Sequence, residues 1–353
     1  MKPFFSIIIP CCDVEPYVRE CLDSVLKQDF QSWECLVGVE TSKDRTEEIV
    51  RGYAAKDERI KVFTGERSGS CSASRNTGTD MATGEYVVFL DGDDLIAEGS
   101  LKRIHDKIES RPGADLYPAA ITVCDGRAKP TGEIRDNYPA LFEKEMTGPE
   151  ATVLLEKLFE KSFPCPMLQL TVFRREFLVE HDLKCIYGLR HQDSEFSPRA
   201  LYLAKRVIPI HEPFYLYRIR ENSVQTKAKA PGSFHRDLAI RLKSLIDFHA
   251  AKARESGFDR RISKAWARRW TSTIYRMWFA PASVAAVPEN VRKDTLAIIF
   301  KDGTCNFDIL LKSARLPARI AGRWVEKSLR GPKWSKAAEL FFKALYSPVL
   351  SRF

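Results

Sequence analysis

The first 110 residues alternate short apolar runs with amphipathic patterns, and this alternation restricts the chain to a few architectures. Apolar runs at 5–9, 33–39, 60–63 and 85–90 predict strands, while 15–28, 44–55, 71–83 and 99–110 predict helices. A series of this kind implies right-handed crossovers, so the predicted fold class is α/β, with a Rossmann-like, doubly wound and mainly parallel sheet. In such sheets, ligands bind outside the carboxyl ends of the strands.

The pattern is looser after residue 113. Strands are predicted at 114–124, 168–173 and 214–219, and helices at 149–162 and 194–204. Residues 234–279 have a helical pattern with arginine-rich faces, and five prolines divide the chain beyond it. A length of 353 residues suffices for one domain of about 200 to 250 residues and a smaller appendage.

Cysteine usage and hydropathy indicate a reducing compartment. The nine cysteines include no Cys-x-x-Cys pair, and Cys11 and Cys12 fall inside an apolar strand pattern. We therefore expect buried thiols, with neither a disulfide framework nor a zinc site. Charged residues follow the first strand directly, and the longest uncharged apolar run, 277–288, is too short to cross a bilayer. The expected location is cytoplasmic.

The net charge of +9 is concentrated at one end of the chain. Residues 312–353 hold ten Lys or Arg against two Glu, so this segment carries +8 and the rest of the chain only +1. A nucleic-acid-binding protein would need basic charge spread along a groove, and the distribution therefore argues against nucleic acid as a partner.

Three aspartates follow the fourth predicted strand in the stretch FLDGDD, residues 89–94. Unit charges about 4 Å apart repel by roughly 1 kcal/mol in water and about 4 kcal/mol near a protein surface. Leu95 and Ile96 follow where an EF-hand loop would continue with polar ligands and glycine, so that interpretation fails. Two remain: a solvated Asp-Gly turn, and a Mg²⁺ or Mn²⁺ site completed by substrate phosphates.

Other polar residues are predicted near the same edge of the sheet. The small-residue loop Ser70–Gly78 runs into a helix, where Arg75 either faces an anion or is a surface residue of an ordinary capped helix. Glu40 ends the second strand, and is either an acceptor for a base or ribose or a solvated turn acid.

Four ordered motifs together resemble glycosyltransferase family 2, the inverting enzymes of the GT-A fold. They are FSIIIPCCDVEPYVRECLDSVLKQDFQSWECLVGVETSKDRT, SASRNTGTDMATGEYVVFLDGDD, HQDSEF and YRIRENSVQT, and they span about residues 3–226. The resemblance implies a nucleotide-sugar donor, usually a UDP-sugar, held by a divalent metal at an Asp-x-Asp motif. The members that it suggests are bacterial surface-polysaccharide glycosyltransferases.

The resemblance assigns roles residue by residue. Asp91 and Asp93 match the metal motif for Mn²⁺ or Mg²⁺, with Asp93 the direct ligand and Asp94 in support. Glu40 stands where the family has a base-reading Asp, Cys12 where many members have a Tyr, and Arg75 matches a nucleotide-contacting arginine. The predicted donor-binding residues are Pro10, Cys12, Asp13, Glu40, Arg75, Asp91, Gly92, Arg218, Arg220 and Ser223.

Asp193 matches the family's catalytic base in HQDSEF, although Gln192 replaces an acidic residue there and cannot titrate. A helix N-cap is the plainer role for Asp193, and both roles can coexist; Glu195 is the rival base. Alternation places Arg218 and Arg220 on one side of a strand. There they either close over the diphosphate or form the ion pairs of an edge strand.

The predicted organisation has three parts: a GT-A domain at 1–226, a helical region at 227–311 and a basic amphipathic tail at 312–353. Bases interleaved with aromatics in the tail are typical of a helix on an anionic membrane surface; packing on the catalytic domain is the alternative. The predicted function is transfer of one sugar to a glycan or lipid-linked acceptor at the inner face of the cell membrane. A non-catalytic nucleotide-sugar-binding protein and a sugar-phosphate nucleotidyltransferase are the alternatives.

Overall fold

The computed structural model describes residues 2–136, 144–159, 168–220, 233–255, 258–274, 277–278 and 286–300. Ser223 and the basic tail 312–353 lie outside these ranges, so the predictions made for them are not addressed by the structure. The chain divides into two compact units. Unit 1 comprises 1–151 and 164–227, and unit 2 comprises 152–163 and 228–353.

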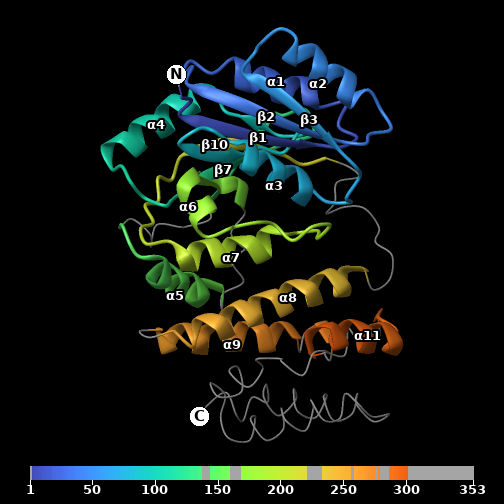
Figure 1. Ribbon diagram of the computed structural model, residues 1–353, viewed down its shortest axis with the longest axis vertical. Helices are drawn as coiled ribbons and strands as arrows, with labels where there is room; N and C mark the ends of the chain where they lie inside the picture. Colours follow the sequence, from blue (N-terminus) through green and yellow to red (C-terminus); the bar gives the residue numbers. More distant parts are fainter. Residues whose placement is uncertain are drawn as a thin grey trace, which may run out of the picture. The chain divides into compact units, whose positions relative to one another are not determined.

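A six-stranded sheet forms the centre of unit 1, in the order β3-β2-β1-β4-β9-β6 (Figure 1). Strands β1 (Phe5–Cys11), β2 (Trp33–Glu40), β3 (Ile60–Gly65) and β4 (Tyr86–Phe89) are parallel. The helices between them are α1 (Val18–Leu26), α2 (Thr46–Ala54) and α3 (Ser72–Met81). The predicted α/β alternation of the first 90 residues is therefore confirmed.

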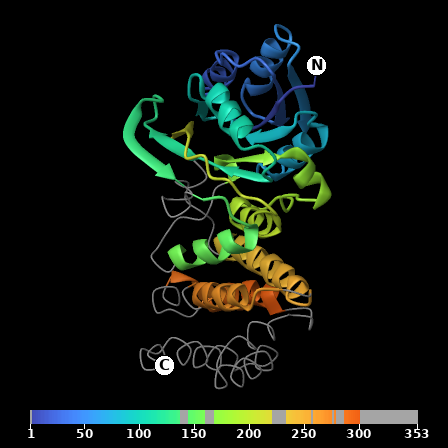
Figure 2. The same ribbon diagram turned by 90° about the vertical axis from the view of Figure 1, so that its left-hand side faces the viewer.

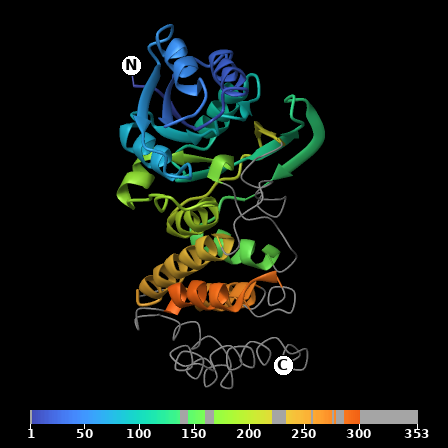
Figure 3. The ribbon, with the colours of Figure 1, turned by 90° about the vertical axis from the view of Figure 1, so that its right-hand side faces the viewer.

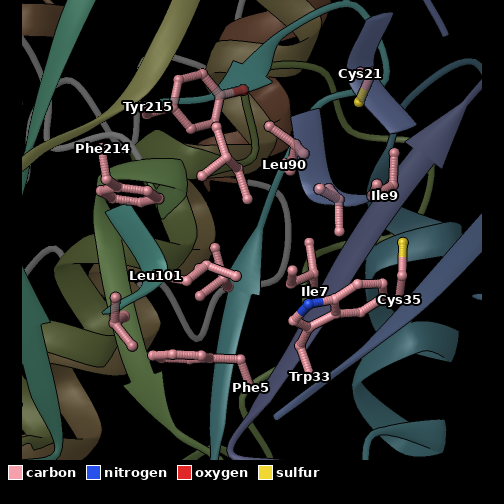
Figure 4. Packing of buried hydrophobic residues seen from close by; sticks show 14 of the residues in the cluster. Phe5, Ile7, Ile9, Cys21, Trp33, Cys35, Leu90, Leu101, Phe214 and Tyr215 are labelled. Atoms are coloured by element: carbon pink, nitrogen blue, oxygen red, sulfur yellow. The ribbon is translucent and has the colours of Figure 1, made fainter. Parts of the chain in front are cut away.

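The core of unit 1 lies between this sheet and α1. Every residue of β1 and β2 is buried, as expected for strands covered on both faces. Alternate residues of β1, including Ile7 and Ile9, join a cluster with Val18, Leu22 and Val25 of α1. Figure 4 shows the part of this cluster around Phe5, Trp33 and Tyr215. The intervening residues of β1 face the opposite side.

Two glycines allow α3 to lie unusually close to β1 and β2. A Cβ on Gly78 of α3 would come within 2.5 Å of Ile8 Cγ2, and one on Gly38 of β2 would come within 2.7 Å of Ser74 Cβ. Real Cβ atoms do not tolerate these distances, so both positions require glycine for close approach. In Figure 1, α3 covers one face of β1–β3 and α1 and α2 cover the other.

The sheet is mixed rather than parallel beyond β4. β9 (Thr171–Arg174) pairs antiparallel with β4, and β6 (Leu116–Pro118) pairs antiparallel with β9. The single strand predicted at 114–124 is wrong: the chain leaves this sheet at Ala119 and enters a second one as β7 (Ala120–Cys124). Leu168–Leu170, predicted as the start of a strand, is a 3₁₀ turn, η2.

The second sheet has the order β5-β10-β7-β8. Its other strands are β5 (Leu95–Ile96), β8 (Pro130–Asp136) and β10 (Pro213–Arg218). In Figures 2 and 3 the β7–β8 hairpin runs out from the side of unit 1. Because β10 lies between β5 and β7, the prediction that Arg218 belongs to an edge strand is wrong.

The remaining helices of unit 1 are α4 (Ser100–Ser110), α6 (Arg175–Glu180) and α7 (Asp193–Leu203). Helix α5 (Gly148–Phe159) begins in unit 1 and continues into unit 2. Five of the seven cysteines that the structure describes are buried, Cys12 and Cys71 are partly exposed, and all seven are free thiols. The expectation of buried thiols is thus confirmed for those five.

Unit 2 contains α8 (Ser233–Lys252), α9 (Arg260–Ile274) and α11 (Glu289–Phe300), which lie side by side in Figures 2 and 3. The predicted helical stretch 234–279 is therefore interrupted between α8 and α9. Aromatic rings pack between α8 and α9. The rings of Trp266 and Trp270 stack on each other, and the centroid of the His249 ring lies 5.1 and 5.4 Å from theirs. No helix within the described ranges is long and apolar enough to cross a membrane.

His249 makes the stability of unit 2 depend on pH. Burial lowers the pKa of His249 from 6.5 to about 4. Between these values the unfolded chain binds a proton that the folded chain does not, so the free energy of unfolding falls as the pH falls. From pH 7.5 to pH 5 we expect a loss of about 2 kcal/mol from this residue. Urea unfolding followed by tryptophan fluorescence at the two pH values measures it.

The control is His249→Phe, which keeps an aromatic ring packed against Trp266 and Trp270 but cannot titrate. Its loss of stability between pH 7.5 and pH 5 should be smaller than that of the unmodified chain by about 2 kcal/mol. Equal losses in the two proteins would show that the His249 ring is not the source.

Candidate active site

The carboxyl ends of β1, β2 and β4 bring most of the predicted site residues to one edge of the sheet. Parallel pairing sets Pro10 beside Gly38 and Cys11 beside Val39, so Cys12 and Asp13 emerge next to Glu40. On the other side of β1, Gly92 N–H donates to the Pro10 carbonyl at 3.3 Å. A Cβ on Gly92 would lie 2.7 Å from Cys11 Sγ, which keeps this turn tight against β1.

Glu40 and Asp13 form the part of the site nearest β2. Glu40 is 4% exposed, and its two oxygens accept from the Ser68 hydroxyl at 2.7 Å and the Ser68 N–H at 3.0 Å. Asp13 accepts from the Lys43 N–H at 2.7 Å and from Arg67 at 2.6 Å. Both contacts lower the pKa of Asp13, and the hydrogen bond from the Lys43 N–H has the larger effect. Contact of this group with a nucleobase stays a prediction.

Asp91 is held by one donor on each oxygen. Arg75 Nη2 donates to Oδ1 at 2.5 Å, and Gln169 Nε2 donates to Oδ2 at 2.8 Å. Arg75 is 3% exposed; burial, the largest single effect, lowers its pKa, but the charge and hydrogen bond of Asp91 together with Cys71 and Cys185 outweigh burial, so the pKa of Arg75 is raised. Arg75 is thus the buried partner of Asp91 and not the surface residue of the plainer interpretation. Its direct contact with a nucleotide stays a prediction.

The other end of the Arg75 guanidinium reaches Gln192. With the Gln192 amide oriented so that its oxygen accepts, Arg75 Nη1 donates to it at 2.7 Å, and the Gln192 NH₂ donates to Leu189 O at 3.1 Å. Asp91, Arg75 and Gln192 therefore form one hydrogen-bonded chain. Gln192 is the residue next to Asp193, so this chain connects the aspartates after β4 to the start of α7.

Helix α3 also holds the segment that leads to Asp193. The Asn76 side chain exchanges two 2.8 Å hydrogen bonds with the backbone of Cys185, and the Gly188 N–H donates to the Ser72 hydroxyl at 2.9 Å. His191 has a left-handed backbone, with φ of 53°, just before α7 begins. The run Ser72–Asn76, singled out for anion binding, thus also attaches residues 185–192 to α3.

Asp193 is the first residue of α7 and is partly exposed, but Gln192 is the N-cap residue, so the N-cap role predicted for Asp193 is wrong by one position. Its rival Glu195 is fully buried, and both of its oxygens accept from Arg199, at 2.6 and 2.8 Å. A carboxylate enclosed in this way cannot reach an acceptor hydroxyl without breaking the pair. The geometry favours Asp193 over Glu195 as the candidate base.

Asp93 and the two arginines of the late motif meet on the far side of the aspartate turn. Arg220 Nε donates to Asp93 Oδ2 at 2.5 Å, and Arg218 Nη2 donates to Glu20 Oε2 at 2.5 Å. Both guanidinium groups lie over the Tyr17 ring, at 5.0 and 5.2 Å from its centroid. Both predicted arginines are therefore in ion pairs here, and their closure over a diphosphate stays a prediction.

Asp94 is a structural residue of the turn. It is 2% exposed, accepts from the Tyr215 hydroxyl at 2.6 Å and accepts from the Arg218 N–H at 2.7 Å. The Tyr215 hydroxyl also accepts from the Asp91 N–H at 3.2 Å. Asp94 and Tyr215 thus join the turn after β4 to β10, in the role of support that the sequence predicts for Asp94.

Replacing Tyr215 by Phe removes both of these hydrogen bonds and leaves a buried Asp94 oxygen without its donor. We expect the free energy of unfolding to fall by about 1–3 kcal/mol, measured by urea unfolding at pH 7.5. Tyr53→Phe is the matched control, because the Tyr53 hydroxyl donates to Asp23 at 2.7 Å near the surface. A loss no larger than in this control would mean that Tyr215 does not support the turn.

The aspartates fit a divalent cation bound partly by substrate oxygens. Burial, followed by the like charge of Asp91, raises the pKa of Asp93; burial, followed by Asp93, raises the pKa of Asp94. Three carboxylates lie at this turn and two guanidinium groups, Arg75 and Arg220, pair with them, so the turn keeps an excess of negative charge. Carboxylate oxygens are ligands that Mg²⁺ and Mn²⁺ prefer. Within the described part of the chain, no group of three or more His, Cys, Asp or Glu forms a metal-binding cluster. Asp91 and Asp93 alone would supply one or two ligands.

Two residues of this site were not predicted from the sequence, Gln169 and Tyr215. Both come from strands or turns far along the chain and carry no motif. Tyr215 lies within an apolar strand, where it is indistinguishable from a core residue.

Comparison with known proteins identifies the family. The model of "Glycosyl transferase family 2" matches residues 6–176, which include β1 to β4 and the aspartate turn. The uncharacterized glycosyltransferase EpsJ of Bacillus subtilis (strain 168) is 33% identical over 227 residues, covering 64% of this chain and 63% of EpsJ. Residues 6–176, just under half of the chain, match glycosyltransferase family 2.

Another relative of this chain is, by its name, a transferase that acts on a poly(ribitol-phosphate) polymer. The poly(ribitol-phosphate) beta-N-acetylglucosaminyltransferase TarS of Staphylococcus aureus (strain Mu50 / ATCC 700699) is 26% identical over 310 residues, covering 81% of this chain and 50% of TarS. The crystal structure of S. aureus TarS residues 1–349 in complex with UDP-GlcNAc matches with a TM-score of 0.67 at 19% identity. That alignment covers 98% of this chain and 91% of the TarS fragment, and confirms the GT-A-like α/β fold.

Proposed function

We propose that this family 2 protein is an inverting glycosyltransferase that moves a sugar from a UDP-sugar to a hydroxyl of a glycan or lipid-linked acceptor. The product would be a cell-surface polysaccharide. The relatives by name favour this substrate class, because TarS is named as a poly(ribitol-phosphate) beta-N-acetylglucosaminyltransferase and its structure contains UDP-GlcNAc. UDP-GlcNAc is therefore the first donor to test.

One observation carries the proposal: the hydrogen-bonded chain from Asp91 through Arg75 to Gln192. Through one buried arginine it links Asp91 of the candidate donor motif to Gln192, the residue before the candidate base Asp193, and this supports the proposal. A displacement reaction needs this proximity, because the nucleophile and the leaving group act on the same carbon. A protein that only binds a nucleotide-sugar does not need a base close to its donor-binding motif.

In the reaction, Asp193 accepts the proton of the acceptor hydroxyl while the oxygen of that hydroxyl attacks the anomeric carbon. The bond from this carbon to the diphosphate oxygen breaks, and the configuration inverts. Position matters more than a large pKa shift, since the acceptor loses its proton as the new bond forms. Arg220, which follows β10 and is paired with Asp93, is the cation best placed to stabilise the departing diphosphate.

Asp93, with Asp91 beside it, would hold Mn²⁺ or Mg²⁺, which supplies electrophilic stabilisation of the diphosphate charge when bound. The residues of the chain prepare this site. Arg75 and Gln169 fix both oxygens of Asp91, and Tyr215 fixes the turn through Asp94. The site is therefore oriented by the protein before substrate arrives.

We also propose that the tail 312–353 associates with the inner face of the membrane, because it combines a charge of +8 with interleaved aromatics. Flotation with anionic liposomes compares the whole chain with a chain ending at residue 311. Equal flotation by the two proteins would remove the tail as the anchor.

The test of the proposed function is thermal-shift screening of UDP-sugars with and without Mn²⁺, followed by a UDP-release assay with glycan acceptors. The expected result is stabilisation by a UDP-sugar that requires Mn²⁺, and turnover with at least one acceptor. No stabilisation by any nucleotide-sugar would refute the proposal. Stabilisation that persists with no release of UDP, even to water, would favour a non-catalytic binder.

A further inference from the structure

Gln169 makes only one of the two interactions that its side chain offers. The NH₂ group donates to Asp91 Oδ2 at 2.8 Å, whereas the Oε1 atom is buried and has no hydrogen-bond partner in the structure. A buried carbonyl oxygen without a donor is unfavourable, and in native proteins it usually has an explanation. A donor that arrives with a ligand is such an explanation.

The orientation of this amide is fixed by chemistry. If the amide were turned over, Oε1 would face the Asp91 carboxylate, and two acceptor oxygens would be in contact. The NH₂ group therefore stays on Asp91 and Oε1 stays on the other side. The neighbours Leu168 and Leu170 are buried, so the backbone that carries Gln169 is held in place.

Strand pairing places Gln169 beside Asp91. In the antiparallel pair of β4 and β9, Tyr86 is opposite Arg174 and Val87 is opposite Phe173. Continuing this register past the end of β4 sets position 169 opposite position 91. Gln169 is thus part of the hydrogen-bonded chain that continues through Arg75 and Gln192 to the residue before Asp193.

The missing partner is a donor, and this restricts the ligand. A diphosphate has only acceptor oxygens at neutral pH and cannot satisfy Oε1. A sugar has several hydroxyl donors, and the sugar is the part of the substrate that must lie between the diphosphate near Asp93 and the base at Asp193. We infer that Gln169 Oε1 accepts a hydrogen bond from a hydroxyl of the transferred sugar and so selects the donor sugar.

This inference rests on the proposed function, and its test separates the two. Affinities of the preferred UDP-sugar, of its analogue lacking one hydroxyl and of UDP alone are measured by calorimetry with Mn²⁺. The proteins are the full chain and its Gln169→Met variant, which has a similar shape but no acceptor. For one hydroxyl, the unmodified chain should bind the analogue about tenfold more weakly than the parent sugar.

In the Gln169→Met variant this tenfold preference should disappear, whatever common change the loss of the donor to Asp91 makes in the affinities for UDP and for the UDP-sugars. The difference between the two preferences isolates the contact between Gln169 and the hydroxyl, as in a double-mutant cycle. Gln169→Lys is the second variant, because it retains a donor toward Asp91 but has no acceptor. It should lose the same preference even if the Met variant folds poorly.

Two results would overturn the inference. Equal weakening of every UDP-sugar and of UDP would mean that Gln169 acts only by holding Asp91. An unchanged preference for all hydroxyls in both variants would mean that Oε1 does not contact the sugar and is met by water. Failure of the unmodified chain to bind any UDP-sugar is a different outcome, which refutes the proposed function and the inference with it.

Discussion

Replacing Asp193 by Asn is expected to lower kcat by about 10²–10⁴-fold, without weakening donor binding more than about threefold. Asparagine keeps the size and the hydrogen-bonding capacity of a helix N-terminal residue but cannot accept the proton of the acceptor hydroxyl. The measurement is UDP release under saturating donor and acceptor, with calorimetry of the UDP-sugar for binding. A fall in kcat with unchanged affinity is the signature of a lost base.

Glu195→Gln is the matched control for this prediction. Glu195 is also an acid of α7, two residues away, but it is buried and paired with Arg199. Its replacement should reduce stability because a buried charge loses its partner, while kcat per folded molecule stays within about tenfold. If Asp193→Asn keeps full turnover and Glu195→Gln loses it, the assignment of the base is wrong.

Replacing Asp93 by Asn is expected to abolish the Mn²⁺-dependent stabilisation by UDP and to reduce turnover by about 10²–10³-fold. The free energy of unfolding without ligands should stay within about 1 kcal/mol of the original. The reason is that burial and the neighbouring charge of Asp91 raise the pKa of Asp93. An ionised Asp93 therefore costs free energy in the folded chain at neutral pH, and removing its charge offsets the lost contact with Arg220.

Asp94→Asn is the control, because the same substitution is made one residue away. Asp94 accepts from the Tyr215 hydroxyl and from the Arg218 N–H, and an asparagine would turn its NH₂ group toward one of these donors. We expect a loss of about 1–3 kcal/mol in stability, with the Mn²⁺ response retained in the folded protein. If Asp94→Asn instead loses the Mn²⁺ response and Asp93→Asn instead loses stability, the roles given to Asp93 and Asp94 are wrong and must be exchanged.

The parallel half of the fold was predictable because local patterns and chain order determine it. Strands β1, β2 and β4 are buried along their whole length, and β1, β2 and β3 are each followed directly by a helix. Right-handed connections then leave little freedom in their arrangement. The acids at the ends of these strands follow from the same geometry.

The antiparallel additions were not predictable in this way. A period-two pattern does not say which strand it pairs with, so the insertion of β9 between β4 and β6 is invisible in the sequence. The run 114–124 is apolar apart from Asp115 and Thr122, and its pattern does not show that the chain changes sheets at Ala119. β5 has only two residues, too few to show any period.

The candidate site was predictable where motifs supply residues and not where the tertiary structure does. Asp91, Arg75 and Asp193 belong to motifs, whereas Gln169 meets Asp91 across 78 positions of sequence. The burial of Arg75 was also unforeseen, because a sequence does not show that α3 approaches the sheet closely enough to enclose a guanidinium. Gln192, a departure from the family pattern, acquires a role only once Arg75 is seen beside it.

The close approach of α3 to the sheet at Gly38 and Gly78 has a consequence for the active site. Ser72, Arg75 and Asn76 project from this helix to the aspartate turn and to the segment before α7. The distance between α3 and β1 therefore determines where these side chains of the candidate site lie, although neither glycine is itself a predicted site residue. A methyl group at Gly78 would push α3 away from β1. Both the aspartate turn and the segment before α7 would then shift, because side chains of α3 hold both.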